Sequence, residues 1–447
     1  MSVQTTRSIW RNYLHYLIPT IIGAVAHTIY CMADVFFVSH GVGPTGLAGL
    51  NVALPIFTVY TMFSLLIGVG AATTISVCQG AGEPEKANTS FTLAFFLNLA
   101  IGILISVIGS LMMDDVARLL GADEQLLPYV TDYLRPISAT AFMYMMSSMM
   151  TVIVRSDGAP KLVMVASTAG NLCNVLLDYV TVNLLQWGMF GAGLATAIGP
   201  CVSLMILSVH FVRKQNQIRF TRRIRDLRIV LRILRNGIGS SVLEISSGLV
   251  IFLFNIALLQ VSGSQAVAVF TIISNIGYVG KGIFSGMAQA AQPMISIHYG
   301  AKDFFTLRQA NRCAMITALV FAAVVYILIL LFPDFIISTF VSNDLQILSM
   351  GRPAIRIYFL SFIFTGLNTI LMYYFQSVEK ASYTMTIAVL RGIVLIVAGL
   401  LILPHILQIT GVWLTLPLAE ILTFCLFFPL LFPFERRLQR SLSSEAK

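Results

Sequence analysis

The sequence has little charge: Asp, Glu, Lys and Arg together make up 11% of its 447 residues. Soluble proteins carry about a quarter of their residues as charged side chains, so this composition excludes an ordinary soluble domain. Hydrophobic residues make up 57% of the chain, and the mean hydropathy is +0.86. We therefore predict an integral membrane protein.

The sequence also lacks the alternating apolar and polar ten-residue segments that are typical of an outer-membrane barrel. It has instead twelve apolar runs that are each long enough to cross about 30 Å of hydrocarbon as a helix. These runs lie near residues 13–38, 46–74, 88–112, 128–153, 160–184, 188–211, 237–261, 266–293, 310–333, 350–375, 381–405 and 408–433. We predict an all-α membrane protein with twelve transmembrane helices.

Several chemical signatures are missing as well. There is no phosphate-binding G-x-x-x-x-G-K-[ST] loop, no HExxH motif and no arrangement typical of a Ser/His/Asp hydrolase. The six cysteines show no paired metal-ligand spacing, so we expect apolar packing rather than disulfides or a zinc site. We therefore expect a protein that is not an enzyme and that draws on an ion gradient or the membrane potential.

The positions of the basic residues predict how the chain is oriented in the membrane. With the N-terminus inside, most Lys and Arg fall in segments on one side of the membrane, and residues 213–235 alone hold nine. This distribution predicts that both termini lie in the cytoplasm, and the membrane that we expect is the bacterial cytoplasmic (inner) membrane. Because the topology explains the net charge of +9, we expect no nucleic-acid partner.

The two halves of the chain resemble each other at an offset of about 220 residues. Ile75-Ser76 aligns with Ile295-Ser296, and Gly80-Ala81 aligns with Gly300-Ala301. Because six spans is an even number, the two repeats run parallel. We expect them to rock against each other as in a secondary transporter. We also expect the protein to function as a monomer. The predicted domains are an N-terminal six-helix lobe (1–211), a basic cytoplasmic linker (212–236), a C-terminal six-helix lobe (237–435) and a cytoplasmic tail (436–447).

One acid stands inside the first apolar run. Asp34 lies within "YCMADVFFVSHGVG", and a charged side chain at bilayer depth costs at least about 2.5 to 3.5 kcal/mol on insertion scales. Intramembrane acids usually face a wet cavity and have a function. We therefore predict a functional role for Asp34.

Two longer stretches resemble a known family. The segments "MADVFFVSHGVGPTGLAGLNVALPI" and "GMAQAAQPMISIHYGAKDF" are similar to the multidrug and toxic-compound extrusion (MATE) transporters and, within them, to the MepA-like subgroup. The resemblance covers most of the chain. It implies two six-helix lobes and the export of small organic compounds, often cationic or lipophilic, in exchange for H⁺ or Na⁺.

The resemblance also implies a coupling site. Its positions correspond to Asp34, Asn174, Asp178 and Thr196, and we expect H⁺ or Na⁺ at these four residues and no covalently bound cofactor. Asn174 and Asp178 are four residues apart and therefore share a helix face. Carboxylate, amide and hydroxyl oxygens suit a hard cation or a transferable proton. The repeat places no second acid at the matching positions, so the site is expected in the first lobe alone.

Other polar residues inside the spans are further candidates. His27 and Tyr30 lie on the Asp34 face and could extend a proton relay, although a buried, hydrogen-bonded histidine is the alternative. Arg391 and Glu420 are expected to pair across helices for packing. Possible substrate or proton sites are Glu244, Lys281, Gln289 and Gln292, of which Lys281 could instead snorkel and the glutamines could satisfy a backbone kinked at Pro293.

The substrate cavity has a weaker signature. Met145 and Met149 lie in "FMYMMSSMM", and flexible thioethers suit promiscuous binding, but packing methionines are the alternative. Tyr358 and Tyr373 could offer cation–π contacts. The leading hypothesis is a cation-coupled multidrug antiporter in the lipid bilayer. The alternatives are a lipid-linked-oligosaccharide flippase of the same twelve-helix plan, which should favour a large cationic groove, and a passive channel, which the repeat disfavours.

Overall fold

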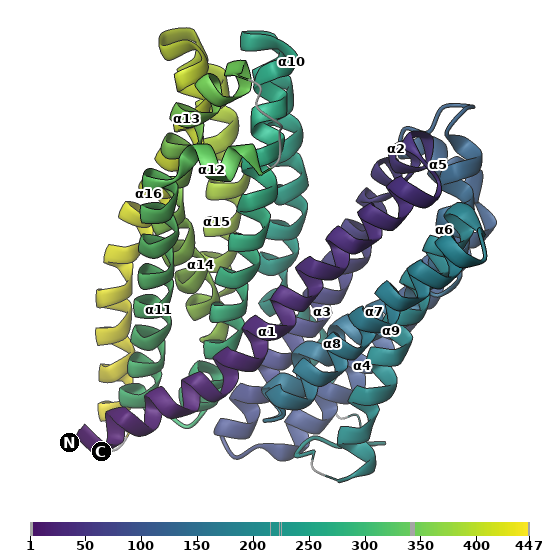
Figure 1. Cartoon of the computed structure of the whole chain (residues 1–447). Helices are drawn as coiled ribbons and strands as arrows, with labels where there is room; N and C mark the ends of the chain where they lie inside the picture. The colour runs from purple at the N-terminus through teal and green to yellow at the C-terminus, as the bar shows by residue number, and fades with distance from the viewer. Residues whose placement is uncertain (1–2, 215, 223, 225, 340–344, 446–447) are drawn as a thin grey trace. The chain divides into compact units, whose positions relative to one another are not determined.

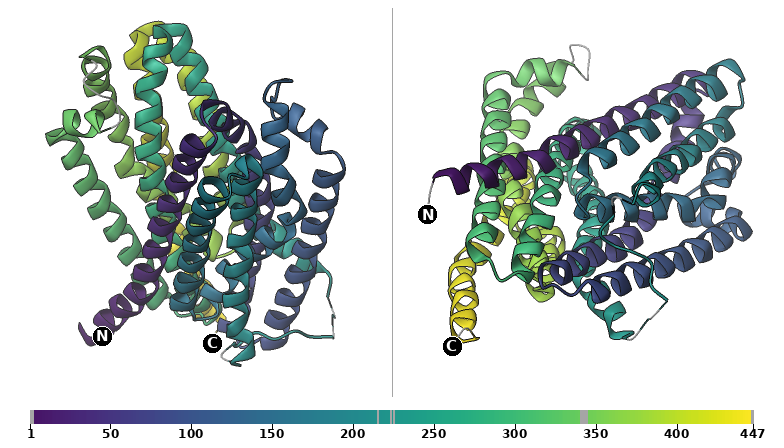
Figure 2. Two further views of the ribbon diagram at one scale, coloured as in Figure 1. Left: turned by 45° about the vertical axis from the view of Figure 1, so that its right-hand side comes forward. Right: turned by 90° about the horizontal axis from the view of Figure 1, so that it is seen from below.

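The computed structural model describes residues 3–214, 216–222, 224, 226–339 and 345–445, and all regular structure in these ranges is helical. The chain forms two compact units (Figures 1 and 2). The first unit is Leu14–Ser241, and the second unit combines Met1–Tyr13 with Val242–Lys447.

The first unit contains most of the helices of the N-terminal half. They are α1 (Val3–Gly41), α2 (Pro44–Ala53), α3 (Pro55–Gly80), α4 (Pro84–Leu111), α5 (Met113–Leu119), α6 (Leu127–Ala139), α7 (Ala141–Ser156), α8 (Pro160–Asp178), the π-helix η1 (Tyr179–Leu184) and α9 (Gly188–Val212). Several of them begin with proline at the first helical position, where the missing N–H has no intrahelical partner to lose. Proline therefore fixes where these spans start.

The second unit contains most of the remaining helices. They are α10 (Arg228–Gly300), α11 (Phe304–Leu331), α12 (Pro333–Ser338), α13 (Leu345–Phe359), α14 (Ser361–Ser377), α15 (Ala381–Val389), the π-helix η2 (Leu390–Val394) and α16 (Leu395–Glu445). Two of these helices contain a residue with positive φ: Gly263 in α10 (φ 76°) and Gln408 in α16 (φ 52°). Each of these residues breaks a long helix into two spans.

The described residues contain nine helical segments that are long and apolar enough to cross a membrane. Two of these, α10 and the segment that contains α16, are each divided by the break just described. The pair α6 and α7, bent by 58°, forms one further span. Counted in this way the described residues have twelve spans, which confirms the predicted fold class. The bend was not predicted from the apolar run at 128–153.

The predicted basic linker is partly attached to the first unit. The backbone N–H of Gln217 donates to the buried carboxylate of Asp157 (2.9 Å), which also accepts from His210 Nε2 (2.8 Å) and Gln79 Nε2 (3.1 Å). Further along, the N–H of Arg219 donates to Asn88 Oδ1 (2.7 Å). From Arg228 onward the predicted linker is helical, as the start of α10.

The beginning and the end of the chain belong to the second unit. The hydroxyl of Tyr13, which is fully buried, lies 2.9 Å from Thr317 Oγ1 on α11. At the other end α16 continues to Glu445, while residues 446–447 of the predicted cytoplasmic tail lie outside the described residues. The domain boundaries and the side of the membrane stay predictions.

Candidate functional site

Two glycines set the spacing of α8 and α9. A Cβ atom on Gly170 would lie 2.7 Å from the carbonyl oxygen of Gly199, and a Cβ on Gly199 would lie 3.0 Å from the carbonyl oxygen of Gly170. Only residues without a side chain allow two helix backbones to approach this closely. One turn away from this contact, Asn174 Nδ2 reaches Thr196 Oγ1 at 3.4 Å, and both side chains are buried.

Asp178 ends α8 one turn beyond Asn174. Its side chain is fully buried, and the helix widens directly after it into η1, which runs from Tyr179 to Leu184. Single π-helical turns inside α-helices are rare and occur frequently at functional sites. The structure therefore places a carboxylate at a local irregularity of the fifth span.

Asp34 reaches the same region from α1. It is 6% exposed, and its carboxylate interacts electrostatically with that of Asp178. The structure thus brings together the four predicted coupling residues, which come from three helices. The backbone of Gly193 packs directly on the carbonyl of Tyr133, and this contact holds α6 against α9.

Tyr133 is a member of this cluster that we did not predict. Its side chain is buried, and its hydroxyl lies close enough to the carboxylate of Asp34 and to the hydroxyl of Thr196 to interact with both. In the sequence Tyr133 is a tyrosine one turn before Pro136 in an apolar span, a context shared by ordinary packing tyrosines. The need of Asp34 for a donor could have suggested that a donor exists, but not which residue supplies it.

Four oxygen atoms of the cluster lack a hydrogen-bond donor among the described residues. They are Asp34 Oδ1, Asn174 Oδ1, Asp178 Oδ1 and Asp178 Oδ2. A buried acceptor without a donor costs about 1 to 3 kcal/mol, and more when it is charged. Two carboxylates buried side by side also repel each other. This oxygen set therefore fits a proton or a hard cation such as Na⁺.

The two proposed relay residues have different surroundings. Tyr30 lies close enough to Asp34 to interact electrostatically with it, and its ring packs edge to face on His27. His27 is exposed at the surface of α1, with Nδ1 3.7 Å from Cys31 Sγ. The described contacts thus connect Tyr30 with Asp34, and His27 with Tyr30 and Cys31. A relay through either residue stays a prediction.

The predicted cavity methionines are part of the core. Met145 and Met149 are both fully buried, and each packs in an apolar cluster of the first unit. Met149 also lies against Gly68, whose added Cβ would be 3.1 Å from the Met149 Cα. In this structure both methionines therefore act as packing residues, which is the alternative that the sequence left open.

The candidates of the second unit come from several helices. Glu244 is half-buried on α10, and Gln292 is buried near Pro293. Gln289 Nε2 lies 3.5 Å from the hydroxyl of Tyr373, which is at the limit of a hydrogen bond. These residues stay candidates for substrate contacts.

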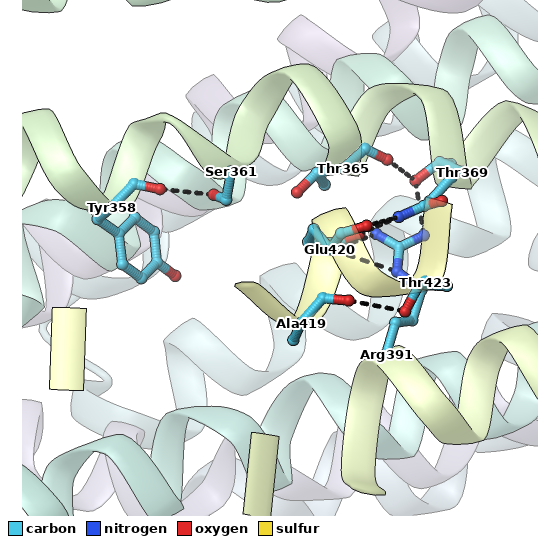
Figure 3. A network of polar contacts seen from close by, with 9 residues as sticks. Tyr358, Ser361, Thr365, Thr369, Arg391, Ala419, Glu420 and Thr423 are labelled. Carbon is cyan, nitrogen blue, oxygen red and sulfur yellow. Dashed lines mark hydrogen bonds and ion pairs between the residues drawn. The ribbon is translucent and has the colours of Figure 1, made fainter. Parts of the chain in front are cut away.

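Arg391 and Glu420 form a buried ion pair, so the predicted pairing is confirmed (Figure 3). Arg391 donates from Nη2 (2.8 Å) and Nε (3.2 Å) to Glu420 Oε1, and from Nη1 to Thr369 Oγ1 (3.1 Å). The second oxygen, Glu420 Oε2, accepts from Asn368 Nδ2 at 2.7 Å. Both oxygens of Glu420 therefore have a donor, in contrast to the two oxygens of Asp178. Lys281 and Tyr358 lie near this pair.

Comparison with known proteins identifies the family. The MatE family model matches residues 19–180 and 238–401, which is most of both halves of the chain. The chain belongs to the MatE family. The two matched segments of this MatE protein fall in the two halves that the sequence predicted, and the first of them contains Asp34, Tyr133, Asn174 and Asp178.

Curated relatives of this MatE protein carry one common name. The chain is similar to a multidrug export protein MepA of Staphylococcus saprophyticus, with 23% identity over 417 residues that cover 92% of this chain and 91% of the relative. A multidrug export protein MepA of Staphylococcus haemolyticus is 24% identical over 96% of this chain and 94% of its own length. These matches confirm the resemblance to the MepA-like subgroup.

Solved structures share the fold. One, described as the outward-facing conformation of a multidrug resistance MATE family transporter of the MOP superfamily, has 25% identity and a TM-score of 0.90, and the match covers 97% of both chains. A second is a MOP superfamily transporter from Pyrococcus furiosus, for which a binding pocket of reversed polarity was taken to suggest a different function. It also has 25% identity and a TM-score of 0.90, over 96% of this chain and 97% of its own.

Proposed function

We propose that this MatE protein is a secondary active antiporter that exports small organic compounds, often cationic or lipophilic, in exchange for H⁺ or Na⁺ by alternating access. The observation that carries the proposal is the acid cluster of Asp34, Asn174, Asp178, Thr196 and Tyr133, with four buried oxygens that lack donors. The name shared by the staphylococcal relatives supports multidrug export.

Coupling follows from differential binding. A ligand shifts a conformational equilibrium only as far as it binds one state better than the other. Asp34 and Asp178 come from different helices, so a proton or Na⁺ held between them stabilises the state in which α1 and α8 are close. Release of the ion removes this stabilisation and favours a state in which the two acids separate or become hydrated.

We also propose the membrane in which the protein resides, the side on which its termini lie and its oligomeric state. The protein lies in the bacterial cytoplasmic membrane with both termini in the cytoplasm and acts as a monomer. The proposal is supported by the twelve spans of the described residues and by the basic segments between them.

Dye efflux from energised vesicles tests the function, with the proton gradient and the sodium gradient imposed separately. Efflux that requires one of the two gradients supports the antiport. Efflux at the full rate after both gradients have been collapsed would exclude it.

A further inference from the structure

The second unit contains a buried group of charges that the coupling site does not use. It consists of Lys281 on α10, Tyr358 on α13, Asn368 and Thr369 on α14, Arg391 in η2 and Glu420 on α16, and we name it the α10–α16 cluster. Lys281 is close enough to Glu420 and Arg391 to interact electrostatically with both. Two cations and one acid give the cluster a formal charge of +1.

Both carboxylate oxygens of Glu420 already have hydrogen-bond donors without Lys281. Glu420 Oε1 accepts two bonds from Arg391, and Glu420 Oε2 accepts from Asn368 (Figure 3). Arg391 also donates a hydrogen bond to Thr369. The pair is therefore neutral and complete, and Lys281 adds a charge that this pair does not need.

Lys281 itself has no hydrogen bond and no ion pair with any residue that the structure describes. It lies in a membrane-spanning part of α10, where an isolated ammonium costs at least about 2.5 to 3.5 kcal/mol. The neighbouring Gly280 packs directly on the ring of Phe362, which holds the backbone of α10 in place at this point. A half-buried cation that has no hydrogen-bonded or ion-paired partner among the described residues suits an anion from outside the chain.

Two further features favour a ligand over a packing role. Arg391 lies in η2, so this cluster, like Asp178 of the first unit, is placed at a π-helical segment of its helix. Tyr358 is only 2% exposed and lies within electrostatic reach of the same Glu420, so a phenol hydroxyl is present in the same region of the second unit. An ammonium group forms charge-assisted hydrogen bonds with oxygen anions.

We propose that Lys281 binds an oxyanion such as a carboxylate or phosphate group, and that the compounds which this protein exports include ones that carry such a group. The second part rests on the proposed export function, whereas the first part does not. The two sources of the group, a substrate and an anionic lipid headgroup, are separated by the experiment.

The test uses two dyes that differ at one group. Rhodamine 110 carries a free carboxylate, and rhodamine 123 is its methyl ester. Binding of both dyes is measured by fluorescence anisotropy on the full-length protein in nanodiscs of phosphatidylcholine. We expect the wild type to prefer the acid, and Lys281→Gln to weaken binding of rhodamine 110 by about tenfold or more, the usual size for loss of a charge-assisted hydrogen bond, with binding of rhodamine 123 changed by less than about twofold.

Three controls complete the binding test. Lys281→Arg keeps the charge and should keep most of the preference. Lys86→Gln, which changes an exposed lysine paired with Glu83, should behave as wild type. Nanodiscs with added phosphatidylglycerol identify the source: competition with rhodamine 110 in the wild type but not in Lys281→Gln would show that a lipid headgroup uses the same oxyanion site.

The inference is wrong if the wild type binds neither dye or shows no preference for the acid, or if Lys281→Gln weakens both dyes equally. Efflux of rhodamine 123 from vesicles is measured in parallel. A wild type that shows no acid preference but intact efflux would overturn the anion site alone. A Lys281-dependent acid preference without efflux of either dye would overturn the export proposal alone.

Discussion

Asp34 of α1 and Asp178 of α8 lie close enough for their carboxylates to interact, although the sequence between them includes three whole spans. Water solvates such a pair poorly inside the bundle, so it requires a positive charge from outside the protein. The account of transport therefore depends on an ion that these two residues bind and release.

The first prediction concerns the charge of Asp34. Asp34→Asn keeps the shape of the side chain but removes the charge, so we expect ion-driven dye efflux from vesicles to fall by about tenfold or more, since a hydrogen bond to a charged group contributes roughly 1.5 to 3 kcal/mol. The amount of protein in the membrane should not change. Asp132→Asn, which alters an exposed acid on α6 beside Tyr133, is the matched control. Full efflux by Asp34→Asn would remove this residue from the mechanism.

The second prediction concerns Tyr133, whose hydroxyl lies close to Asp34 and Thr196. Tyr133→Phe deletes only the hydroxyl, so the expected loss is smaller, about threefold to tenfold in ion-driven efflux, as for one hydrogen bond. The concentration of Na⁺ or H⁺ that gives half-maximal efflux should shift by a similar factor. Tyr144→Phe is a suitable control on the neighbouring α7. An unchanged ion dependence in Tyr133→Phe would show that this hydroxyl does not serve the ion site.

The third prediction concerns the contact of α8 with α9. Gly170→Ala places a Cβ against Gly199 and against Ser203 Oγ, and we expect a loss of about 1 to 3 kcal/mol in stability together with weaker ion coupling. Thermal unfolding in detergent measures the first effect and vesicle efflux the second. At Gly248 an added Cβ would meet open space, so Gly248→Ala should be neutral or stabilising. Equal behaviour of the two variants would contradict the close packing.

The fourth prediction concerns the Arg391–Glu420 pair. Arg391→Met leaves Glu420 buried without its cation, and such a change typically costs about 3 to 5 kcal/mol. The double variant Arg391→Met/Glu420→Leu removes both charges and should recover much of this loss. Equilibrium unfolding of the single and double variants gives the comparison. A double variant that is less stable than either single variant would show that the pair is worth more than its apolar replacement.

The fifth prediction concerns the basic linker. Asp157→Ala removes the acceptor that holds the backbone of Gln217, so the linker should open more often. Limited digestion with trypsin should then cut at Arg219 or Arg222 several-fold faster, by roughly the factor that a lost hydrogen bond of about 1 kcal/mol implies. Asp226→Ala, which leaves the Asp157 contacts intact, is the control. Equal cutting rates in the two variants would argue against the attachment.

Much of the architecture could be predicted because lipid imposes a length and a polarity on every span. The twelve apolar runs matched the twelve spans of the described residues, and the pairing of Arg391 with Glu420 followed from the cost of isolated charges in a membrane. The bend between α6 and α7 was not visible in the apolar pattern, since hydropathy does not report the direction of a helix axis.

The candidate site was predicted only in part. The cost of a charge inside the membrane singled out Asp34. The family resemblance supplied Asn174, Asp178 and Thr196 as its partners, and spacing agreed that Asn174 and Asp178 share a helix face. The role of Tyr133 depends on how closely α6 approaches α9, which a glycine contact decides and a single sequence does not reveal. Lys281 could be read as a cavity residue or a snorkelling one, because its neighbours come from spans far away in the chain.

The most direct measurement of coupling reverses the usual experiment. Purified protein is reconstituted in vesicles without any ion gradient, a gradient of an exported dye is imposed, and the movement of H⁺ and of Na⁺ is followed with ion-sensitive probes. The account predicts that one of the two ions moves against the direction of the dye in the wild type and does not move in Asp34→Asn/Asp178→Asn. Dye movement by the wild type with neither ion moving would contradict it.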